Sequence, residues 1–309
     1  MTIPPDASRQ GGAQVPWPVQ VCVRHPDRQT GLRCVRCDRP ACSACMREAS
    51  VGYQCIDCVA QNARSGRRGT TVAGAEPSGR SVVIPALVAI NVAVYAVTVA
   101  QAGSLNGNAS AQLFQQWGLW PTAVAGGELW RLFTSGFLHF GPIHLAFNMI
   151  ALWVIGRDLE QVLGRTRFLA VYLVSLLGGS LSVFLFDHSE AMTAGASGAV
   201  FGLMGGLAVV LLRLRRSPGP ALTIIVLNVV ISFVVPGISI LGHLGGLVFG
   251  TVATAGMVYA PQNRRIAVQA ATVVALLAVI AALVVLRDGQ FGEVSGCRTE
   301  PQVTCVVRH

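Results

Sequence analysis

The chain has 309 residues, of which 52% are hydrophobic and only 12% are charged, and its mean hydropathy is +0.57. This composition excludes an ordinary soluble domain and predicts an all-α polytopic membrane protein. The formal net charge is +9, and all 23 Lys or Arg positions are arginine. Because these arginines lie at the ends of apolar stretches and not on one face of a domain, we expect no nucleic-acid binding.

The first informative segment is a dense group of metal-binding side chains between residues 22 and 58. Two residues separate the members of each pair, and the pairs are Cys22 and His25, Cys34 and Cys37, Cys42 and Cys45, and Cys55 and Cys58. This spacing directs two ligands at one ion, and eight ligands suffice for two closed tetrahedral zinc sites. The alternative is a disulfide knot, against which a reducing cytosolic location argues. We expect two structural zinc ions and no catalytic role for them.

The cysteine-rich segment resembles a B-box-type zinc finger. Its cross-braced pattern would place Cys22, His25, Cys42 and Cys45 on one ion, and Cys34, Cys37, Cys55 and Cys58 on the other. The B-box pattern ends in histidines where this chain has cysteines, so the pairing stays open. We expect a zinc-binding domain at residues 21–60 that binds a cytosolic protein partner. The flanking segments are disordered (1–20) or a flexible linker (61–80), because they are rich in Pro, Gly, Ser, Gln and Arg.

Seven apolar stretches follow the linker and are candidate membrane spans. They are residues 82–102, 143–156, 168–186, 195–212, 221–235, 239–259 and 266–286. Several are shorter than the ~20 residues that a spanning helix needs, so neighbouring helices must shield them. A compact bundle is therefore expected.

The arginines predict how the chain crosses the membrane. They lie before the first stretch and after the second, fourth and sixth, at Arg64, Arg67, Arg68, Arg80, Arg157, Arg165, Arg167, Arg213, Arg215, Arg216, Arg264 and Arg265. The connections after the third and fifth stretches carry none. The positive-inside rule then places the N-terminus in the cytoplasm and the C-terminus outside the cytosol. The first 80 residues have no apolar signal-peptide core, so the first stretch is expected to be an uncleaved signal-anchor.

Polar side chains in the second stretch suggest a buried site. His144 and Asn148 are four residues apart, so they share one face of a helix, and each offers an N–H donor. Such groups need partners inside the bundle, because lipid cannot satisfy them. They could simply join helices, or they could stabilise an oxyanion if a nucleophile lies nearby.

A nucleophile and a base stand at the start of the fourth and sixth stretches. Ser197 is flanked by glycines, and His243 is a costly residue inside a bilayer and therefore a functional candidate. Glycines recur every four residues in both stretches, at Gly198, Gly202, Gly206 and at Gly242, Gly246, Gly250. This pattern predicts close helix packing, which would bring Ser197 and His243 together. No Asp or Glu occurs between Glu190 and Asp288, so we expect a Ser–His dyad.

Taken together, these motifs resemble a rhomboid intramembrane serine protease. The motifs are Trp130-Arg131, His144-x3-Asn148, Gly195-Ala-Ser197-Gly and His243-x2-Gly246. The resemblance implies a six-helix core at residues 81–260 and a seventh span with an extracytosolic tail at 261–309. It implies that Ser197 is the nucleophile, His243 the base, and His144, Asn148 and the Ser197 backbone N–H the oxyanion hole. His139 also matches a position near the site. Phe201 stands where some members have Tyr, and either ring could pack on His243.

The same resemblance implies substrates and no catalytic cofactor. The expected substrates are membrane proteins with a transmembrane helix, cleaved within the lipid bilayer. An intramembrane metalloprotease is disfavoured, because no histidine here is followed by Glu as in H-E-x-x-H. The main alternative is a catalytically inactive rhomboid-like protein that binds membrane clients or serves their quality control. Carboxylates or arginines within the spans would favour a channel or transporter, and the predicted spans contain none.

Two cysteines remain after the last apolar stretch. Cys297 and Cys305 lie in the tail that the arginine distribution places outside the cytosol. An oxidising exterior and a short connecting loop favour a disulfide between them, which we expect to be dispensable for catalysis. The alternative is two free thiols.

Overall fold

The computed structural model describes residues 20–49, 51–64, 69–76, 80–187, 191–235, 237–289, 293–298 and 304–308. The chain divides into two compact units, Met1–Arg68 and Gly69–His309.

The first unit is built from short strands and one helix around buried cysteines. β1 (Val21–Cys22) pairs antiparallel with β2 (His25–Gln29), and β3 (Met46–Glu48) pairs antiparallel with β4 (Tyr53–Cys55). The 3-10 helix η1 (Ser43–Cys45) precedes β3, and α1 (Ile56–Arg64) follows β4. Among its described residues, the buried core is six cysteines with Ala41 and Met46. So few apolar side chains cannot hold a domain together without help from metal or cross-links.

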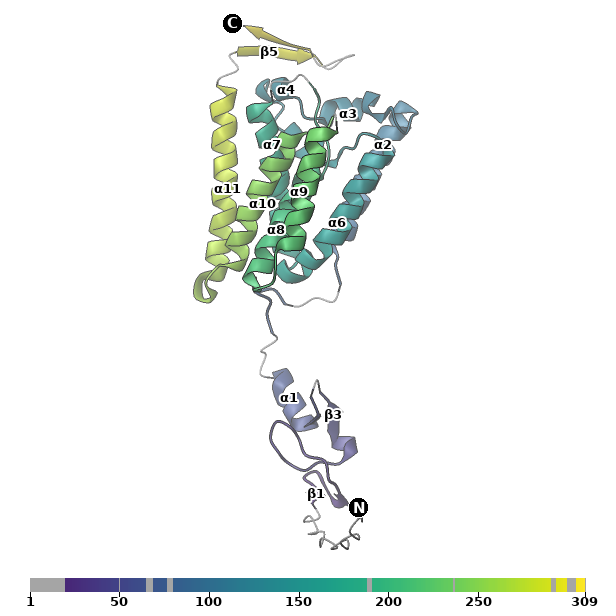
Figure 1. Ribbon diagram of the computed structural model, residues 1–309, viewed down its shortest axis with the longest axis vertical. Helices are drawn as coiled ribbons and strands as arrows, with labels where there is room; N and C mark the ends of the chain where they lie inside the picture. Colours follow the sequence, from purple (N-terminus) through teal and green to yellow (C-terminus); the bar gives the residue numbers. More distant parts are fainter. Residues whose placement is uncertain are drawn as a thin grey trace, which may run out of the picture. The chain divides into compact units, whose positions relative to one another are not determined.

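The second unit is a helical bundle (Figure 1). Its seven longer helices are α2 (Val83–Ala102), α6 (Gly141–Leu163), α7 (Arg165–Phe186), α8 (Ser197–Arg213), α9 (Gly219–Val234), α10 (Ile240–Val258) and α11 (Arg265–Asp288). The segment between α2 and α6 holds the short elements η2 (Asn108–Ser110), α3 (Gln112–Trp117), α4 (Pro121–Ala125), α5 (Arg131–Thr134) and η3 (Ser135–Phe137). The 3-10 turn η4 (Gln262–Arg264) precedes α11. Each predicted apolar stretch corresponds to one of these seven helices, and four of the stretches extend a residue or two beyond the ends of their helix.

Helix length separates these helices into two groups. Among the described residues, α2, α7, α10 and the helical segment Gln262–Asp288 are long and apolar enough to cross a membrane. The pair formed by Arg131–Phe137 and α6 passes the same test only as a unit bent by 93°, which is the geometry of a broken span or of a re-entrant loop. α8 and α9 have only 17 and 16 residues. At 1.5 Å per residue these two helices are shorter than the ~30 Å hydrocarbon layer, so neighbouring helices must shield their ends from lipid.

α6 is longer than its apolar stretch suggested, with 23 residues. Its last turns carry Glu160, which is buried and accepts hydrogen bonds from the first amides of α2, Val82 at 2.8 Å and Val83 at 3.0 Å, and from the Ser81 hydroxyl. A carboxylate at a helix N-terminus satisfies amides that have no partner within their own helix. Glu160 therefore joins the end of α6 to the start of α2.

Glycines bring α7, α8 and α10 into backbone contact. A Cβ placed on Gly246 of α10 would lie 2.6 Å from the carbonyl carbon of Gly198 in α8. A Cβ on Gly250 would lie 2.6 Å from the carbonyl carbon of Gly202. A Cβ on Gly179 of α7 would lie 2.7 Å from the carbonyl oxygen of Gly242. Since only glycine fits at such contacts, the stripes predicted from the sequence are the surfaces along which these helices pack.

At the C-terminal end, two strands follow α11. β5 (Glu293–Arg298) pairs antiparallel with β6 (Thr304–Arg308), and this register places Cys297 opposite Cys305. The side chains of both cysteines lie outside the described residues, so the predicted disulfide stays a prediction.

Candidate active site and metal clusters

Ser197 is the first residue of α8. The chain reaches it through Gly195, whose φ of +135° is accessible to glycine and strained for other residues, and whose amide donates to the Ser135 carbonyl at 3.0 Å. In the first turn of a helix, backbone N–H groups have no partner within the helix. The backbone N–H of Ser197 is thus available next to its own hydroxyl.

His144 lies one turn into α6 and its ring reaches the same point. A Cβ on Gly195 would be 2.9 Å from His144 Nε2 and 3.7 Å from Ser197 Oγ, so both groups border one spot. The Phe140 amide donates to His144 Nδ1 at 3.2 Å. Because that amide can only donate, Nδ1 accepts, and the proton of a neutral imidazole lies on Nε2. Asn148, buried on the same face, donates to the His144 carbonyl at 3.0 Å.

His243 lies in the first turn of α10 and is buried. Its ring stacks on Phe201 of α8, with centroids 4.0 Å apart and planes at 14°, so the expected packing of this ring on the histidine is present. The neighbours of the two candidate residues also meet, since a Cβ on Gly198 would be 3.1 Å from the Gly242 carbonyl oxygen. The start of α8 and the start of α10 are thereby fixed against each other.

Sequence reasoning missed one contact of His243. The hydroxyl of Ser232, on α9, lies 2.7 Å from His243 Nδ1. A serine within an apolar stretch is a weak signal, because such hydroxyls commonly bond back to their own helix. Ser232 belongs to the site only because this face of α9 packs against α10, which the sequence does not reveal.

His139 also lies near the site, since the centroid of its ring is 5.2 Å from the centroid of the His144 ring.

The segment between α2 and α6 is held by Arg131. Its buried guanidinium donates to the carbonyls of Gln115 at 2.6 Å and Gly118 at 2.7 Å, and pairs with Glu128 at 2.5 Å. Asn108 joins the same segment to the start of α6, donating to the His139 carbonyl at 2.8 Å and accepting from the Gly141 amide at 3.1 Å. These bonds fix the chain immediately before His144.

The site lies at one end of the bundle. His144, Ser197 and His243 are all in the first turn of their helices, α6, α8 and α10. Arginines lie in the last two turns of α6 and at or beyond the C-terminal ends of α8 and α10, at Arg157, Arg213, Arg215, Arg216 and Arg264. At that far end Arg213 donates to the Val258 carbonyl at 3.1 Å.

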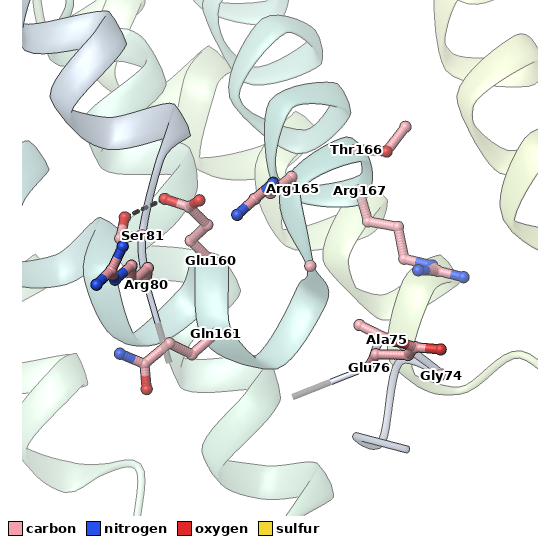
Figure 2. A pocket seen from close by; sticks show the side chains of 11 residues that line it. Gly74, Ala75, Glu76, Arg80, Ser81, Glu160, Gln161, Arg165, Thr166 and Arg167 are labelled. Atoms are coloured by element: carbon pink, nitrogen blue, oxygen red, sulfur yellow. Dashed lines mark hydrogen bonds between the residues drawn. The ribbon is translucent and has the colours of Figure 1, made fainter. Parts of the chain in front are cut away.

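The far end also contains a cavity of about 440 Å³ (Figure 2). Residues around the α6–α7 connection and the segment before α2 line it, including Arg80, Ser81, Glu160, Arg165 and Arg167. Ser197, His144 and His243 are not among its lining residues. We therefore do not assign the chemistry to this cavity.

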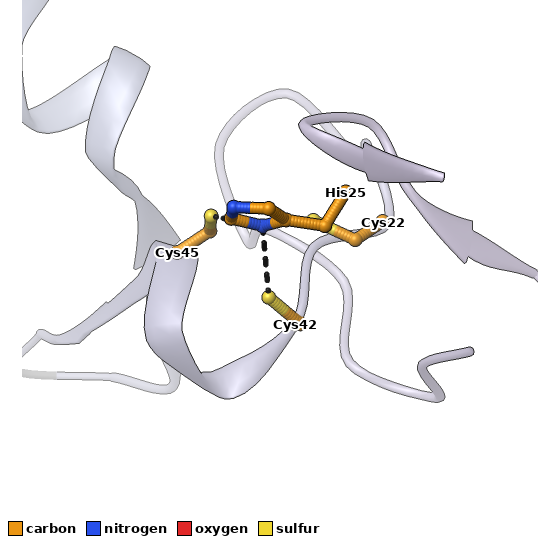
Figure 3. Close-up of side chains that lie close together, drawn as sticks. All are labelled: Cys22, His25, Cys42 and Cys45. Atoms are coloured by element: carbon orange, nitrogen blue, oxygen red, sulfur yellow. Dashed lines mark hydrogen bonds between the residues drawn. The ribbon is translucent and has the colours of Figure 1, made fainter. Parts of the chain in front are cut away.

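In the first unit, the structure brings the eight predicted ligands into two groups. Cys22, His25, Cys42 and Cys45 form one (Figure 3), and Cys34, Cys37, Cys55 and Cys58 form the other. Within each group the ligand atoms all lie within 4.8 Å of one another. His25 presents Nδ1, which is 3.3 Å from Cys45 Sγ and 3.5 Å from Cys42 Sγ. These are the two groups that the cross-braced B-box pattern implies, and each could hold a zinc ion.

The electrostatics of each group favour the thiolate at some cysteines and the thiol at others. Burial raises the pKa of the Cys22 thiol, but hydrogen bonds from the backbone of Cys42 and Arg24 outweigh it and lower that pKa to about 6. In the other group, amides of Cys55, Arg36 and Cys37 act against burial in the same way and lower the pKa of Cys34 to about 6. Burial raises the pKa of Cys45 to about 11 and of Cys58 to about 12. A bound cation would stabilise the thiolates of these last two.

Comparison with known proteins identifies one domain. A family model described as the rhomboid domain matches residues 126–260. The chain is 42% identical over 139 residues to "Rhomboid protease GluP" of Bacillus subtilis, covering 43% of this chain and 27% of that protein. It is 38% identical over 133 residues to "RHOMBOID-like protein 4" of Arabidopsis thaliana, covering 41% and 34%. It is 26% identical over 217 residues to "Rhomboid protease AarA" of Providencia stuartii, covering 61% and 77%. The chain thus spans about a third or less of the first two relatives.

Proposed function

We propose that this chain, whose residues 126–260 match the rhomboid domain and whose relatives include rhomboid proteases, is an intramembrane serine protease that cleaves transmembrane segments of other membrane proteins. The observation that carries the proposal is the contact of α8 with α10 at Gly198 and Gly242, the immediate neighbours of Ser197 and His243. A serine and an imidazole held at one end of two tightly packed helices are suited to nucleophilic catalysis.

In the proposed reaction Ser197 is the nucleophile and His243 the general base. Nε2 of His243 takes the Ser197 proton as Oγ attacks the carbonyl carbon of the scissile peptide. When the tetrahedral intermediate collapses, the C–N bond breaks and the same proton passes to the leaving amine. Water then repeats the sequence on the acyl-enzyme, and Ser197 is restored. No carboxylate is assigned a role, because the sequence between Glu190 and Asp288, which includes Ser197 and His243, contains no Asp or Glu.

His144, Asn148 and the Ser197 backbone N–H are proposed as the oxyanion hole. The hydrogen bond from the Phe140 amide to His144 Nδ1 supports this role, since it leaves the proton on Nε2, beside Gly195 and Ser197. Hydrogen-bond donors fixed where negative charge develops are the main source of rate enhancement in acyl transfer. The N-terminal ends of α6, α8 and α10 add positive dipole ends at the same place.

We propose that this end of the bundle faces the extracytosolic side. Arginines at the opposite end support the orientation through the positive-inside rule. The zinc-binding unit is then cytoplasmic, the tail after α11 is outside, and all seven longer helices cross the membrane. In the cytosolic unit, two structural zinc ions would serve a protein partner or regulation.

The test is cleavage of a model transmembrane substrate by purified protein in liposomes. Wild type is expected to cut it, and Ser197→Ala and His243→Ala each to abolish cleavage. As a matched control, Thr251→Val on α10 removes a hydroxyl that donates to the Leu247 carbonyl of its own helix, and this variant is expected to stay active. Full activity of Ser197→Ala would refute the proposal. Binding of the substrate by a wild type that does not cut it would favour the non-enzymatic alternative.

A further inference from the structure

α9 is the least buried of the helices around the site. Among its described residues only Ala221, Ile225 and Ser232 are buried, while apolar side chains such as Leu227, Phe233 and Val234 are exposed. The one buried polar side chain of this helix therefore faces inward, and the group it meets is His243.

The bonds of Ser232 determine which nitrogen of His243 carries the proton. The hydroxyl lies 2.7 Å from the Asn228 carbonyl oxygen and 2.7 Å from His243 Nδ1. A hydroxyl has one proton, and a carbonyl oxygen can only accept. Both contacts are hydrogen bonds only if Ser232 donates to Asn228 and accepts from an Nδ1–H. His243 is then the tautomer whose Nε2 is unprotonated.

We propose that Ser232 is a positioning residue for catalysis, which holds His243 in the Nδ1–H tautomer and so keeps Nε2 free to accept the proton of Ser197. This inference rests on the proposed function and deepens it. The hydroxyl of Ser232 takes the place that a carboxylate occupies in a Ser–His–Asp triad, where the third group fixes the tautomer and orientation of the imidazole. The stacked ring of Phe201 fixes the plane, and Ser232 fixes rotation within that plane.

A purely structural role for the hydroxyl would look different. Ser175, Thr251 and Thr272 also bond to the carbonyl four residues earlier, which satisfies a hydroxyl within an apolar helix. In the described part of the bundle, none of these three hydroxyls has a second hydrogen bond to a polar side chain. Among these four hydroxyls, Ser232 alone combines the bond to its own helix with a hydrogen bond to a titratable ring.

The first test compares variants of matched shape. Ser232→Thr retains the hydroxyl and Ser232→Val has the same outline without it, so strain from the added methyl group is common to both. We expect kcat for cleavage of the transmembrane substrate to fall about 10-fold in Ser232→Val relative to Ser232→Thr, as for the loss of one hydrogen bond, with KM unchanged. Thr251→Val controls for loss of a back-bonded hydroxyl. Equal kcat in the Thr and Val variants, both folded, would overturn the inference while leaving the protease assignment intact.

The second test needs no catalysis. With ¹⁵N-labelled histidine, NMR at neutral pH should show His243 protonated at Nδ1 and bare at Nε2, its signals being assigned by their loss in His243→Ala. In Ser232→Val the two tautomers should mix. A wild-type ring protonated at Nε2 would overturn the inference. If His243 has the expected tautomer but the wild-type protein cuts no substrate, the proposed protease function is refuted, while the assignment of the His243 tautomer to Ser232 is retained.

Discussion

At the scale of single residues, the two histidines of the site have opposite protonation patterns. His144 accepts at Nδ1 from the Phe140 amide, so its Nε2 donates. His243 has the Ser232 hydroxyl at Nδ1, so its Nε2 is left as an acceptor. An oxyanion donor and a general base need these two different states. In the proposed mechanism, the neighbouring groups would therefore decide which histidine donates to the oxyanion and which acts as the base.

His144→Ala should lower kcat by about 10²- to 10³-fold and leave residual cleavage, because one of several oxyanion donors is lost. His243→Ala should abolish cleavage, because the base has no substitute. The measurement is kcat of both variants on the transmembrane substrate, with folding checked by thermal unfolding. Wild-type kcat in His144→Ala would remove this residue from the proposed oxyanion hole.

At the scale of helices, the Gly-x3-Gly stripes of α8 and α10 could be read from the sequence because they reflect a direct steric rule. A helix face made of glycines every four residues permits backbone contact, and the structure has that contact at Gly198, Gly202, Gly246 and Gly250. Ser232 and Glu160 could not be found in the same way. The partner of each residue lies on another helix, and a sequence pattern does not indicate which faces of distant helices are in contact.

Gly246→Ala should destabilise the bundle by about 1–3 kcal/mol, because the new Cβ would overlap the Gly198 backbone. Gly242→Ala, four residues earlier on the same helix, is the matched control. Its Cβ would be 3.4 Å from Ser239 Oγ and 3.5 Å from Val183, which is ordinary packing. Thermal unfolding in detergent should therefore separate the two variants. Equal stability would contradict the close approach of α8 and α10.

The first unit shows how far spacing alone carries a prediction. Two-residue gaps singled out the eight candidate ligands, because this spacing lets both side chains of a pair point at one ion. The division into two groups came only from the B-box resemblance, and the structure has the same groups. Spacing cannot supply this division, since which pair meets which depends on how β1–β2 and β3–β4 fold together.

At the scale of the whole molecule, metal and catalysis should be separable. Purified protein should contain about two zinc ions per chain, and Cys34→Ser or Cys42→Ser should unfold the first unit, because metal binding there is folding free energy. EDTA should not inhibit cleavage by protein lacking residues 1–60. Elemental analysis and the cleavage assay measure the two effects. Inhibition of the truncated protein by EDTA would instead support metal-dependent proteolysis.

The orientation of the chain can be tested at its C-terminal strands. The register opposes Cys297 to Cys305, and directly opposed residues in an antiparallel pair lie within the Cα separation a disulfide needs. A membrane-impermeant thiol reagent on intact cells should label the tail only after reduction. Labelling that needs permeabilised cells would place the tail in the cytosol and contradict the seven-span orientation. Cys297→Ser should leave cleavage unchanged.

The measurement that tests the central claim most directly is the site of covalent modification by a fluorophosphonate, which reacts with activated serines. Mass spectrometry of the treated protein should find the adduct on Ser197, formed in step with loss of cleavage, and should find none in His243→Ala. Complete inactivation with the adduct on a different serine, or continued cleavage by protein fully modified at Ser197, would contradict the account.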